Sequence, residues 1–287
     1  IPVYYTKAGY AQVVQSIAEI SKRLNQEHWV LEGENQPPLQ DMLMQAYGFD
    51  YVTWWQNFMR KSQPLHYSSY QQGKQIAQQL QRSDALFLLL NSIQQETKPD
   101  LTDNNSEFNS LIASKFTDIN LISLSSTKEL SAKVAELERF VATLSVINDG
   151  GKTAFTITRT RFNNENSSDP ISSLFSQAKQ LPDPLSRWVE QLAGDSWVLL
   201  IQDSKQYINY QWQETVYKEF QNTIAKRYPF DATQQDEISM NDFNHFFSTK
   251  GTLNTFTEQF IKPFLDISSA EWKPKAVNNF VLPISTE

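Results

Sequence analysis

The fold of this chain is decided by the stretch 227–264, which reads RYPF at 227–230, DFNHFF at 242–247 and GTLNTF at 251–256. Large aromatic side chains recur along it, and each buries about 150–250 Å² when it packs in a core. Pro229 and Pro263 interrupt helices, and Gly251 predicts a helix C-terminus in the left-handed conformation. The stretch carries no catalytic grouping. It therefore predicts a tightly packed helical corner with an architectural role.

The composition indicates a folded, acidic chain. Of its 287 residues, 40% are hydrophobic and 13% aromatic, which is enough for a sizeable core. The 8 glycines are few for the turn-rich β folds and the glycine-rich nucleotide-binding folds. The absence of cysteine removes disulfides, thiolate zinc sites and cysteine nucleophiles. A net charge of −7 with scattered Lys and Arg argues against a nucleic-acid partner.

Apolar residues at helical spacing predict helices over most of the chain, and the longest periodic segment is 196–225. Thr6, Ser83 and Ser239 are predicted N-caps, and Pro170 a first helical residue. The polar stretch 98–116 lacks a period and predicts a loop. The predicted helices are 6–24, 39–60, 69–81, 83–95, 128–147, 170–180, 196–225, 240–247 and 252–262.

Residues 152–162 are ambiguous. Their alternating Thr, Ile and Arg favour a strand on propensity, but neighbouring helices can override such a preference, so both structures stay open. The chain as a whole predicts an all-α fold, an irregular multi-helix bundle of two helical subdomains, 1–120 and 121–287. Minor β structure is expected near 152–162 or at the C-terminal end. The apolar runs are too short for a transmembrane helix, and both ends predict a piece of a longer protein.

The sequence contains no complete copy of the catalytic or ligand-binding motifs considered below. Gly150-Gly151-Lys152-Thr153 resembles the end of a phosphate-binding loop, but Val146 stands where the first glycine is needed. His28, His66 and His245 lie far apart and lack the spacing of metal or catalytic pairs. The acidic stretch 231–237 lacks the glycine of a calcium loop. We therefore predict no catalytic residue, no metal, no cofactor and no small-molecule substrate.

The tryptophans are predicted to pack in cores more often than to bind ligands. Trp54, Trp55, Trp197 and Trp212 fall on apolar helical faces, whereas Trp29 and Trp272 lie near segment ends and are expected to be partly exposed. Truncating Trp212 or Phe247 to alanine is accordingly expected to destabilise the fold by about 3–5 kcal/mol.

Taken in order, these residues resemble the periplasmic region of the IcmF/TssM family. The likeness begins at Tyr5-Thr6-Lys7-Ala8-Gly9-Tyr10, continues through the tryptophans, and ends in the 227–256 series. Asp84-Ala85 departs from the family, which more often has a proline after the serine at this point. The residues expected to act as structural anchors are Trp54, Trp197, Trp212, Arg227, Tyr228, Pro229, Phe230, Asp242, Phe243, Phe246, Phe247, Gly251 and Phe256.

The resemblance implies a non-enzymatic scaffold segment of a bacterial secretion-system membrane complex. Family members are inner-membrane core components of type VI systems, with relatives in Dot/Icm-type (type IVB) systems, and the sequence leaves these two open. The expected location is the periplasmic portion of an inner-membrane protein. The implied partners are a DotU/TssL-type inner-membrane protein and, in type VI, an outer-membrane lipoprotein, both contacted outside this stretch.

Two other functions stay open. One is a periplasmic peptide- or protein-binding helical module that uses exposed Trp29 or Trp272. The other is a hydrolase acting on the cell wall, which would need a deep pocket with convergent carboxylates.

Overall fold

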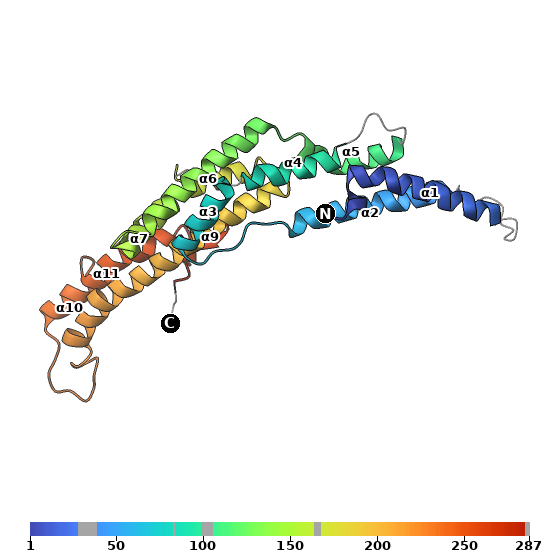
Figure 1. Ribbon diagram of the computed structural model, residues 1–287. Helices are drawn as coiled ribbons and strands as arrows, with labels where there is room; N and C mark the ends of the chain where they lie inside the picture. The colour runs from blue at the N-terminus through green and yellow to red at the C-terminus, as the bar shows by residue number, and fades with distance from the viewer. Residues whose placement is uncertain (28–38, 83, 99–105, 164–167, 285–287) are drawn as a thin grey trace. The chain divides into compact units, whose positions relative to one another are not determined.

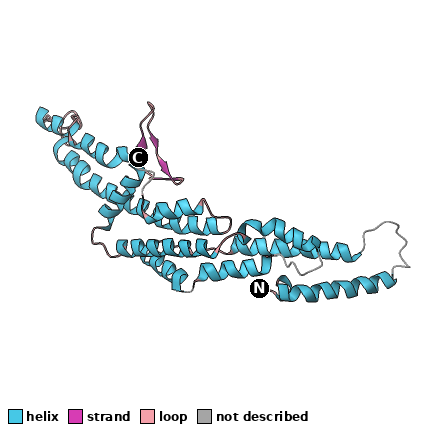
Figure 2. Cartoon of the chain, turned by 90° about the horizontal axis from the view of Figure 1, so that it is seen from above, coloured by secondary structure: helices cyan, strands magenta, loops and turns pink. Residues whose placement is uncertain are grey.

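The computed structural model describes residues 1–27, 39–82, 84–98, 106–163 and 168–284. These residues are mostly helical, with two small antiparallel strand pairs near the C-terminus (Figures 1 and 2), so the all-α prediction is confirmed. None of the described helices combines the length and the apolar character needed to cross a membrane. The helices of the first 163 residues are η1 (Val3–Tyr5), α1 (Lys7–Glu27), α2 (Leu39–Lys61), α3 (Tyr70–Arg82), α4 (Ala85–Thr97), α5 (Ser106–Asn120), α6 (Leu124–Leu144) and α7 (Gly150–Asn163).

The remaining elements carry the chain to the strand pairs. They are α8 (Pro170–Ala178), α9 (Leu185–Gln211), the π-helical turns η3 (Trp212–Tyr217) and η4 (Phe220–Ile224), α10 (Met240–Phe247), α11 (Thr252–Phe256), η5 (Thr257–Ile261), η6 (Lys262–Phe264) and the strands β1 (Leu265–Asp266), β2 (Lys273–Pro274), β3 (Ala276–Val277) and β4 (Phe280–Val281). Strand β1 pairs with β2 and β3 with β4, so the predicted minor β structure lies at the C-terminal end.

The chain forms two compact units that are interleaved along the sequence. Unit 1 is made of residues 1–65, 78–134 and 177–188, and unit 2 of residues 66–77, 135–176 and 189–287. The expected helical subdomains 1–120 and 121–287 stay a prediction.

Unit 1 is built around α2, which packs against α1 and α5. The Trp55 indole is fully buried, and its Nε1 donates a hydrogen bond to the Tyr5 carbonyl at 3.0 Å. Tyr51 is buried beside it and donates to the Glu96 carbonyl at 2.8 Å, and burial raises the pKa of its hydroxyl. These bonds fix η1 and the end of α4 against α2.

The opening of the chain follows the predicted capping. The Thr6 hydroxyl accepts a hydrogen bond from the Gly9 amide at 3.1 Å, which confirms Thr6 as the cap of α1. A Cβ on Gly9 would lie 1.9 Å from the Val3 carbonyl oxygen, so the chain needs glycine here to let η1 pack on the first turn of α1.

Unit 2 is built around the part of α9 from residue 189 onward. This helix begins at Leu185 rather than at the predicted Ser196, and η3 and η4 continue it to Ile224, so the long helical segment is confirmed with an earlier start. Trp188, Val189 and Leu192 extend the apolar face toward the N-terminus and are buried. Pro184 precedes the first residue of the helix, where a proline is tolerated.

Two segments that the sequence did not assign to helices are helical. Helix and strand were both open for residues 152–162, and they form α7, in which Ala154, Phe155, Thr158 and Phe162 make a buried face at helical spacing. The Thr156 and Thr160 hydroxyls bond the preceding turn, donating to the Lys152 and Thr156 carbonyls, each at 2.9 Å. The Thr158 hydroxyl donates to the Leu200 carbonyl at 3.3 Å. This bonding removes the conflict between β-branched residues and a helix.

The loop predicted at 98–116 is wrong from residue 106 onward. Phe108, Ile112, Phe116 and Ile119 are buried along one side of α5, and polar residues between them conceal the period in a short window. Residues 99–105 lie outside the described part of the chain, as do Trp29, His28 and the predicted cap Ser83. Asp84 precedes α4 with a positive φ of 43°.

Candidate functional site: the aromatic corner

The corner begins where η4 ends and the chain turns back through residues 227–238. The Tyr228 amide donates to the Asp236 carbonyl at 2.9 Å, and the Ile238 amide donates to the Tyr228 carbonyl at 3.0 Å. Between them the Asp231 carboxylate accepts from the hydroxyl and the amide of Thr233, and these bonds lower the pKa of Asp231. The loop is therefore closed by its own backbone and delivers the chain to α10.

Helix α10 starts as predicted at Ser239, whose hydroxyl accepts from the Asp242 amide at 3.0 Å. Asp242 lies in the first turn, where the helix dipole favours a carboxylate. Its Oδ2 lies 3.6 Å from a guanidinium nitrogen of Arg227. This ion pair joins two of the expected anchors and ties the start of the loop to the start of the helix.

Gly251 does not have the predicted left-handed conformation. Its φ is −74°, and it precedes α11 as the N-cap residue. A Cβ at this position would lie 2.5 Å from the Phe246 carbonyl oxygen and 2.7 Å from that of His245. Glycine is needed because the end of α10 passes against this residue, not because of its backbone angles.

The substitution Gly251→Ala is expected to lower the free energy of unfolding by about 1–3 kcal/mol, since the new methyl group meets backbone atoms that cannot rotate away. Chemical denaturation followed by circular dichroism measures this. Gly150→Ala is the matched control, because its Cβ would meet nothing within 4 Å. Equal stabilities of the two variants would contradict the proposed close approach.

The inner side of the corner is a row of aromatic rings, most of them buried or half-buried. Phe246, Phe256 and Phe264 are buried, and Phe256 contacts Trp212 with ring centroids 5.3 Å apart. Phe260 continues the row, stacking on Phe256 at 4.8 Å and reaching Phe155 of α7 at 5.1 Å. This row joins η3, α11 and α7 into one packed body.

The outer side of the corner is more exposed than predicted. Trp212 and Phe247 retain 37% and 36% of their accessible surface, which contradicts their expected core placement. For Phe247 the reason is the position of α10, which packs against η4 and α11 and buries Phe246 among its own aromatic residues. The high density of aromatic residues in the sequence reflects two layers, one buried and one exposed.

Because of this exposure, Trp212→Ala and Phe247→Ala are each expected to destabilise unit 2 by about 1–2 kcal/mol, below the range for a buried aromatic truncation. Urea unfolding of the two variants beside the wild type measures this. A loss above about 3 kcal/mol for either would show that the side chain contributes as a core residue does.

The sequence did not identify Arg161, although its surroundings are the most polar part of the core of unit 2. Its side chain is almost fully buried, contacts the Asp169 carboxylate, and donates from Nη2 to Asn278 Oδ1 at 3.0 Å. Its guanidinium lies over the Trp197 ring at 4.3 Å. Burial lowers the pKa of Arg161, and the Asp169 carboxylate opposes that shift. A helical interpretation of 152–162 would have placed this arginine on the apolar face.

The remaining anchors divide by position. Trp197 is fully buried, and its Nε1 donates to the Val277 carbonyl at 3.2 Å. Trp54 of unit 1 is half-buried and stacks on Phe58 at 5.4 Å. Tyr228, Pro229, Phe230 and Phe243 are exposed. The structure thus brings Arg227 to Phe256 together in one corner and places Trp197 and Trp54 elsewhere.

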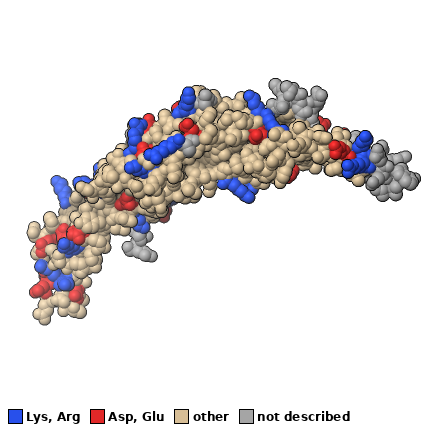
Figure 3. All heavy atoms as spheres, viewed as in Figure 1, with Lys and Arg blue, Asp and Glu red and all other residues tan. Residues whose placement is uncertain are grey.

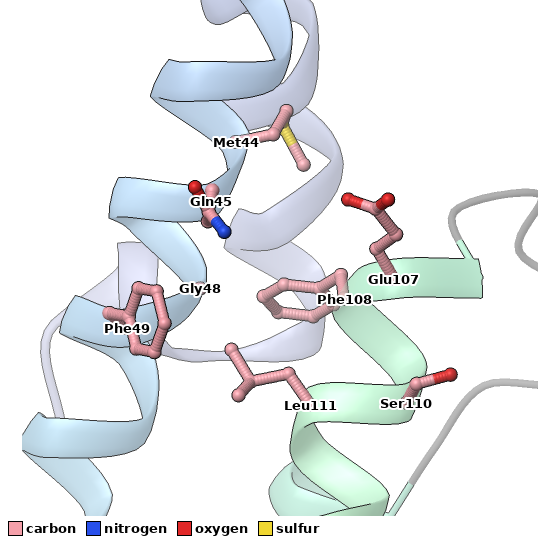
Figure 4. A pocket seen from close by; sticks show the side chains of 8 residues that line it. All are labelled: Met44, Gln45, Gly48, Phe49, Glu107, Phe108, Ser110 and Leu111. Atoms are coloured by element: carbon pink, nitrogen blue, oxygen red, sulfur yellow. The ribbon is translucent and has the colours of Figure 1, made fainter.

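Described residues of unit 1 line the following pockets. A hollow of about 360 Å³ between α2 and α5 has Gly48 and Phe108 at its base and Glu107 at its edge (Figure 4). A second, of about 570 Å³, includes Asp118, Asp183 and Arg187. Arg187 Nε donates to Asp183 Oδ1 at 2.7 Å, so this carboxylate is held in an ion pair. Across the described ranges, no three His, Cys, Asp or Glu residues are grouped to hold a metal ion.

The fold and the corner define an all-helical protein segment whose distinguishing features are aromatic anchors. Residues 1–98 match the family IcmF-related, described as intracellular multiplication and human macrophage-killing. Residues 203–287, which include the whole corner, match the helical domain of the type VI secretion protein IcmF. The chain belongs to the IcmF/TssM family.

A relative agrees with this assignment, and a solved structure has a similar fold. The type VI secretion system component TssM1 of Pseudomonas aeruginosa is 23% identical over 96 residues, which are 33% of this chain and 9% of that protein. A chain of a type VI secretion system membrane core complex has a similar fold, with a TM-score of 0.64 and 14% identity. That likeness covers 96% of this chain and 57% of the solved one. The chain therefore spans little more than half of the solved chain, and its match to TssM1 covers a small part of that protein.

Proposed function

We propose that this chain is a structural segment of the membrane core complex of a bacterial type VI secretion system. The observation that carries the proposal is the fold, which is similar to that of a chain of such a complex over 96% of the present chain. The family assignment supports it from both ends of the sequence. We further propose that the segment works without catalysis on the periplasmic side of the inner membrane.

The contacts suit a part that must hold its shape under load. In unit 2 the row of buried rings joins η3, α11 and α7, and the Arg161 cluster holds the β3–β4 turn. Close-packed interiors have low compressibility and transmit displacement between elements. We propose that the expected anchors act in this way, with the Arg227–Asp242 pair and Gly251 setting the angle of α10 and α11.

The partners are proposed from the family. A DotU/TssL-type inner-membrane protein and an outer-membrane lipoprotein would be contacted by parts of the parent protein that lie outside this segment. Deleting residues 203–264 from the parent protein in its host is expected to abolish secretion and killing of a competing bacterium. Normal secretion by the deletion strain would contradict the structural role.

The location can be tested with a cysteine label, because this stretch contains no cysteine. Glu271→Cys places one thiol at a highly exposed position. A membrane-impermeant maleimide is expected to label it in cells whose outer membrane alone has been permeabilised. Labelling that requires lysis of the inner membrane would contradict a periplasmic location, and a cytoplasmic protein with a known exposed thiol provides the control.

A further inference from the structure

We infer that the outer face of the aromatic corner is a docking surface for a basic, apolar segment of another protein. We define this outer aromatic face as Tyr228, Phe230, Met240, Phe243 and Phe247, which are 49%, 43%, 72%, 37% and 36% exposed. Phe247 stacks on Phe230 with centroids 5.7 Å apart and contacts Phe243 at 4.9 Å. The exposed rings of Phe230, Phe247 and Phe243 are therefore contiguous. Contiguous apolar patches on a surface mark interaction sites.

The outer aromatic face is held in place before any partner arrives. Tyr228 is fixed through both its backbone groups, and the Arg227–Asp242 pair fixes the start of the loop to α10. Beneath the face, Phe246 is buried and lies edge-on to Phe247 with centroids 4.8 Å apart. Rigid aromatic side chains lose little conformational entropy on binding, which is why they dominate the energetics of interfaces.

The neighbouring charges indicate what kind of partner fits. The loop that follows Phe230 contains Asp231, Asp236 and Glu237 and no basic residue between them. Arg227 is paired with Asp242, and the exposed His245 lies 3.8 Å from the Glu219 carboxylate, which leaves Lys226 and Lys250 as the other exposed basic residues of 226–250. Figure 3 shows both signs of charge around uncharged surface at the end that carries α10. The acidic loop beside exposed rings complements a segment that carries Lys or Arg next to apolar side chains.

The same charges argue against two other occupants. A second copy of the chain in a symmetric contact would place the two acidic loops against each other, which is unfavourable. An anionic lipid surface would be repelled for the same reason. The inference stands on this surface alone, and it holds whether or not the chain works in a secretion complex.

The test is a selection from phage-displayed random peptides of 12 residues on the full chain, with Met240→Lys as the counter-selected variant. Met240 is the most exposed member of the face, so a lysine there changes the surface and adds a positive charge that repels a basic binder. We expect the selected peptides to combine aromatic or aliphatic residues with Lys or Arg. Recovery of acidic sequences, or of sequences that bind Met240→Lys equally well, would overturn the inference.

The strongest selected peptide is then titrated against matched variants. Met240→Lys is expected to weaken binding by about tenfold or more, and Met42→Lys, at an exposed methionine of unit 1, to leave it unchanged. The double variant Asp236→Asn/Glu237→Gln should weaken binding by about fivefold at low salt and by less at high salt. The control Glu271→Gln, at another exposed carboxylate, should leave binding unchanged. Far-ultraviolet circular dichroism verifies that each variant is folded.

Two further measurements address the rejected occupants. In sedimentation, the wild type and Met240→Lys are expected to show the same degree of self-association. Vesicles of phosphatidylglycerol are expected not to bind the face. A Met240-dependent dimer, or Met240-dependent vesicle binding, would overturn the inference in favour of a second copy or a lipid surface.

Discussion

Asp169→Ala is expected to lower the free energy of unfolding by about 3–5 kcal/mol, because it leaves the buried Arg161 guanidinium without its carboxylate partner. The same carboxylate accepts hydrogen bonds from the amides of Ile171 and Ser172 at 2.9 and 3.0 Å and so caps α8. The substitution therefore removes an ion pair and a helix cap together. Chemical denaturation followed by circular dichroism measures the loss.

Two variants separate these two contributions, and a third serves as a control. Asp169→Ser retains a capping oxygen and removes the charge, so it should recover about 1 kcal/mol relative to alanine. The double variant Arg161→Met/Asp169→Ala should recover more of the free energy of unfolding, because it removes the uncompensated charge. Glu214→Ala breaks an exposed pair with Lys218 and should cost less than about 1 kcal/mol. A loss of that small size for Asp169→Ala would contradict a stabilising role of the buried pair.

Trp197→Ala is also expected to destabilise unit 2 by about 3–5 kcal/mol, since the indole is fully buried and its removal leaves a cavity. The truncation also removes the ring beneath the Arg161 guanidinium and the donor to the Val277 carbonyl. Trp212→Ala is the matched control at a tryptophan that is 37% exposed, and it should cost much less. Denaturation midpoints of the two variants provide the comparison.

Trp197→Phe tests the hydrogen bond separately from the volume. It keeps most of the ring but leaves the Val277 carbonyl without its donor. Its free energy of unfolding should therefore lie between those of the wild type and the alanine variant. If Trp197→Ala and Trp212→Ala were equally destabilising, burial would not be what distinguishes these two anchors.

Much of the helical framework was predictable because its signals are local. Thr6 and Ser239 cap the helices that follow them, and Pro170 opens α8, since each acts through bonds within one turn. The period of 196–225 was also sufficient to predict the long helix. Helix and strand both stayed open for 152–162, because its β-branched residues favour a strand on propensity. In α7 the Thr156 hydroxyl bonds the preceding turn.

The corner shows what a sequence alone cannot supply. Phe246 and Phe247 are adjacent and chemically identical, yet one is buried and the other is 36% exposed, because their exposure depends on which side of α10 meets η4 and α11. Gly251 was correctly selected as a special position, but its reason is a neighbouring backbone rather than its own torsion angles. The Arg161 cluster joins residues from 161 to 278, a separation that no local pattern reveals.

The interleaving of the two units has a consequence for synthesis on the ribosome. The chain crosses from one unit to the other after residues 65, 77, 134, 176 and 188, and α3, α6, α8 and α9 each contain residues of both. Unit 1 cannot be completed until its last segment, 177–188, has been made, so the apolar surfaces of its earlier segments must wait for that synthesis. No single cleavage of the chain separates the two units.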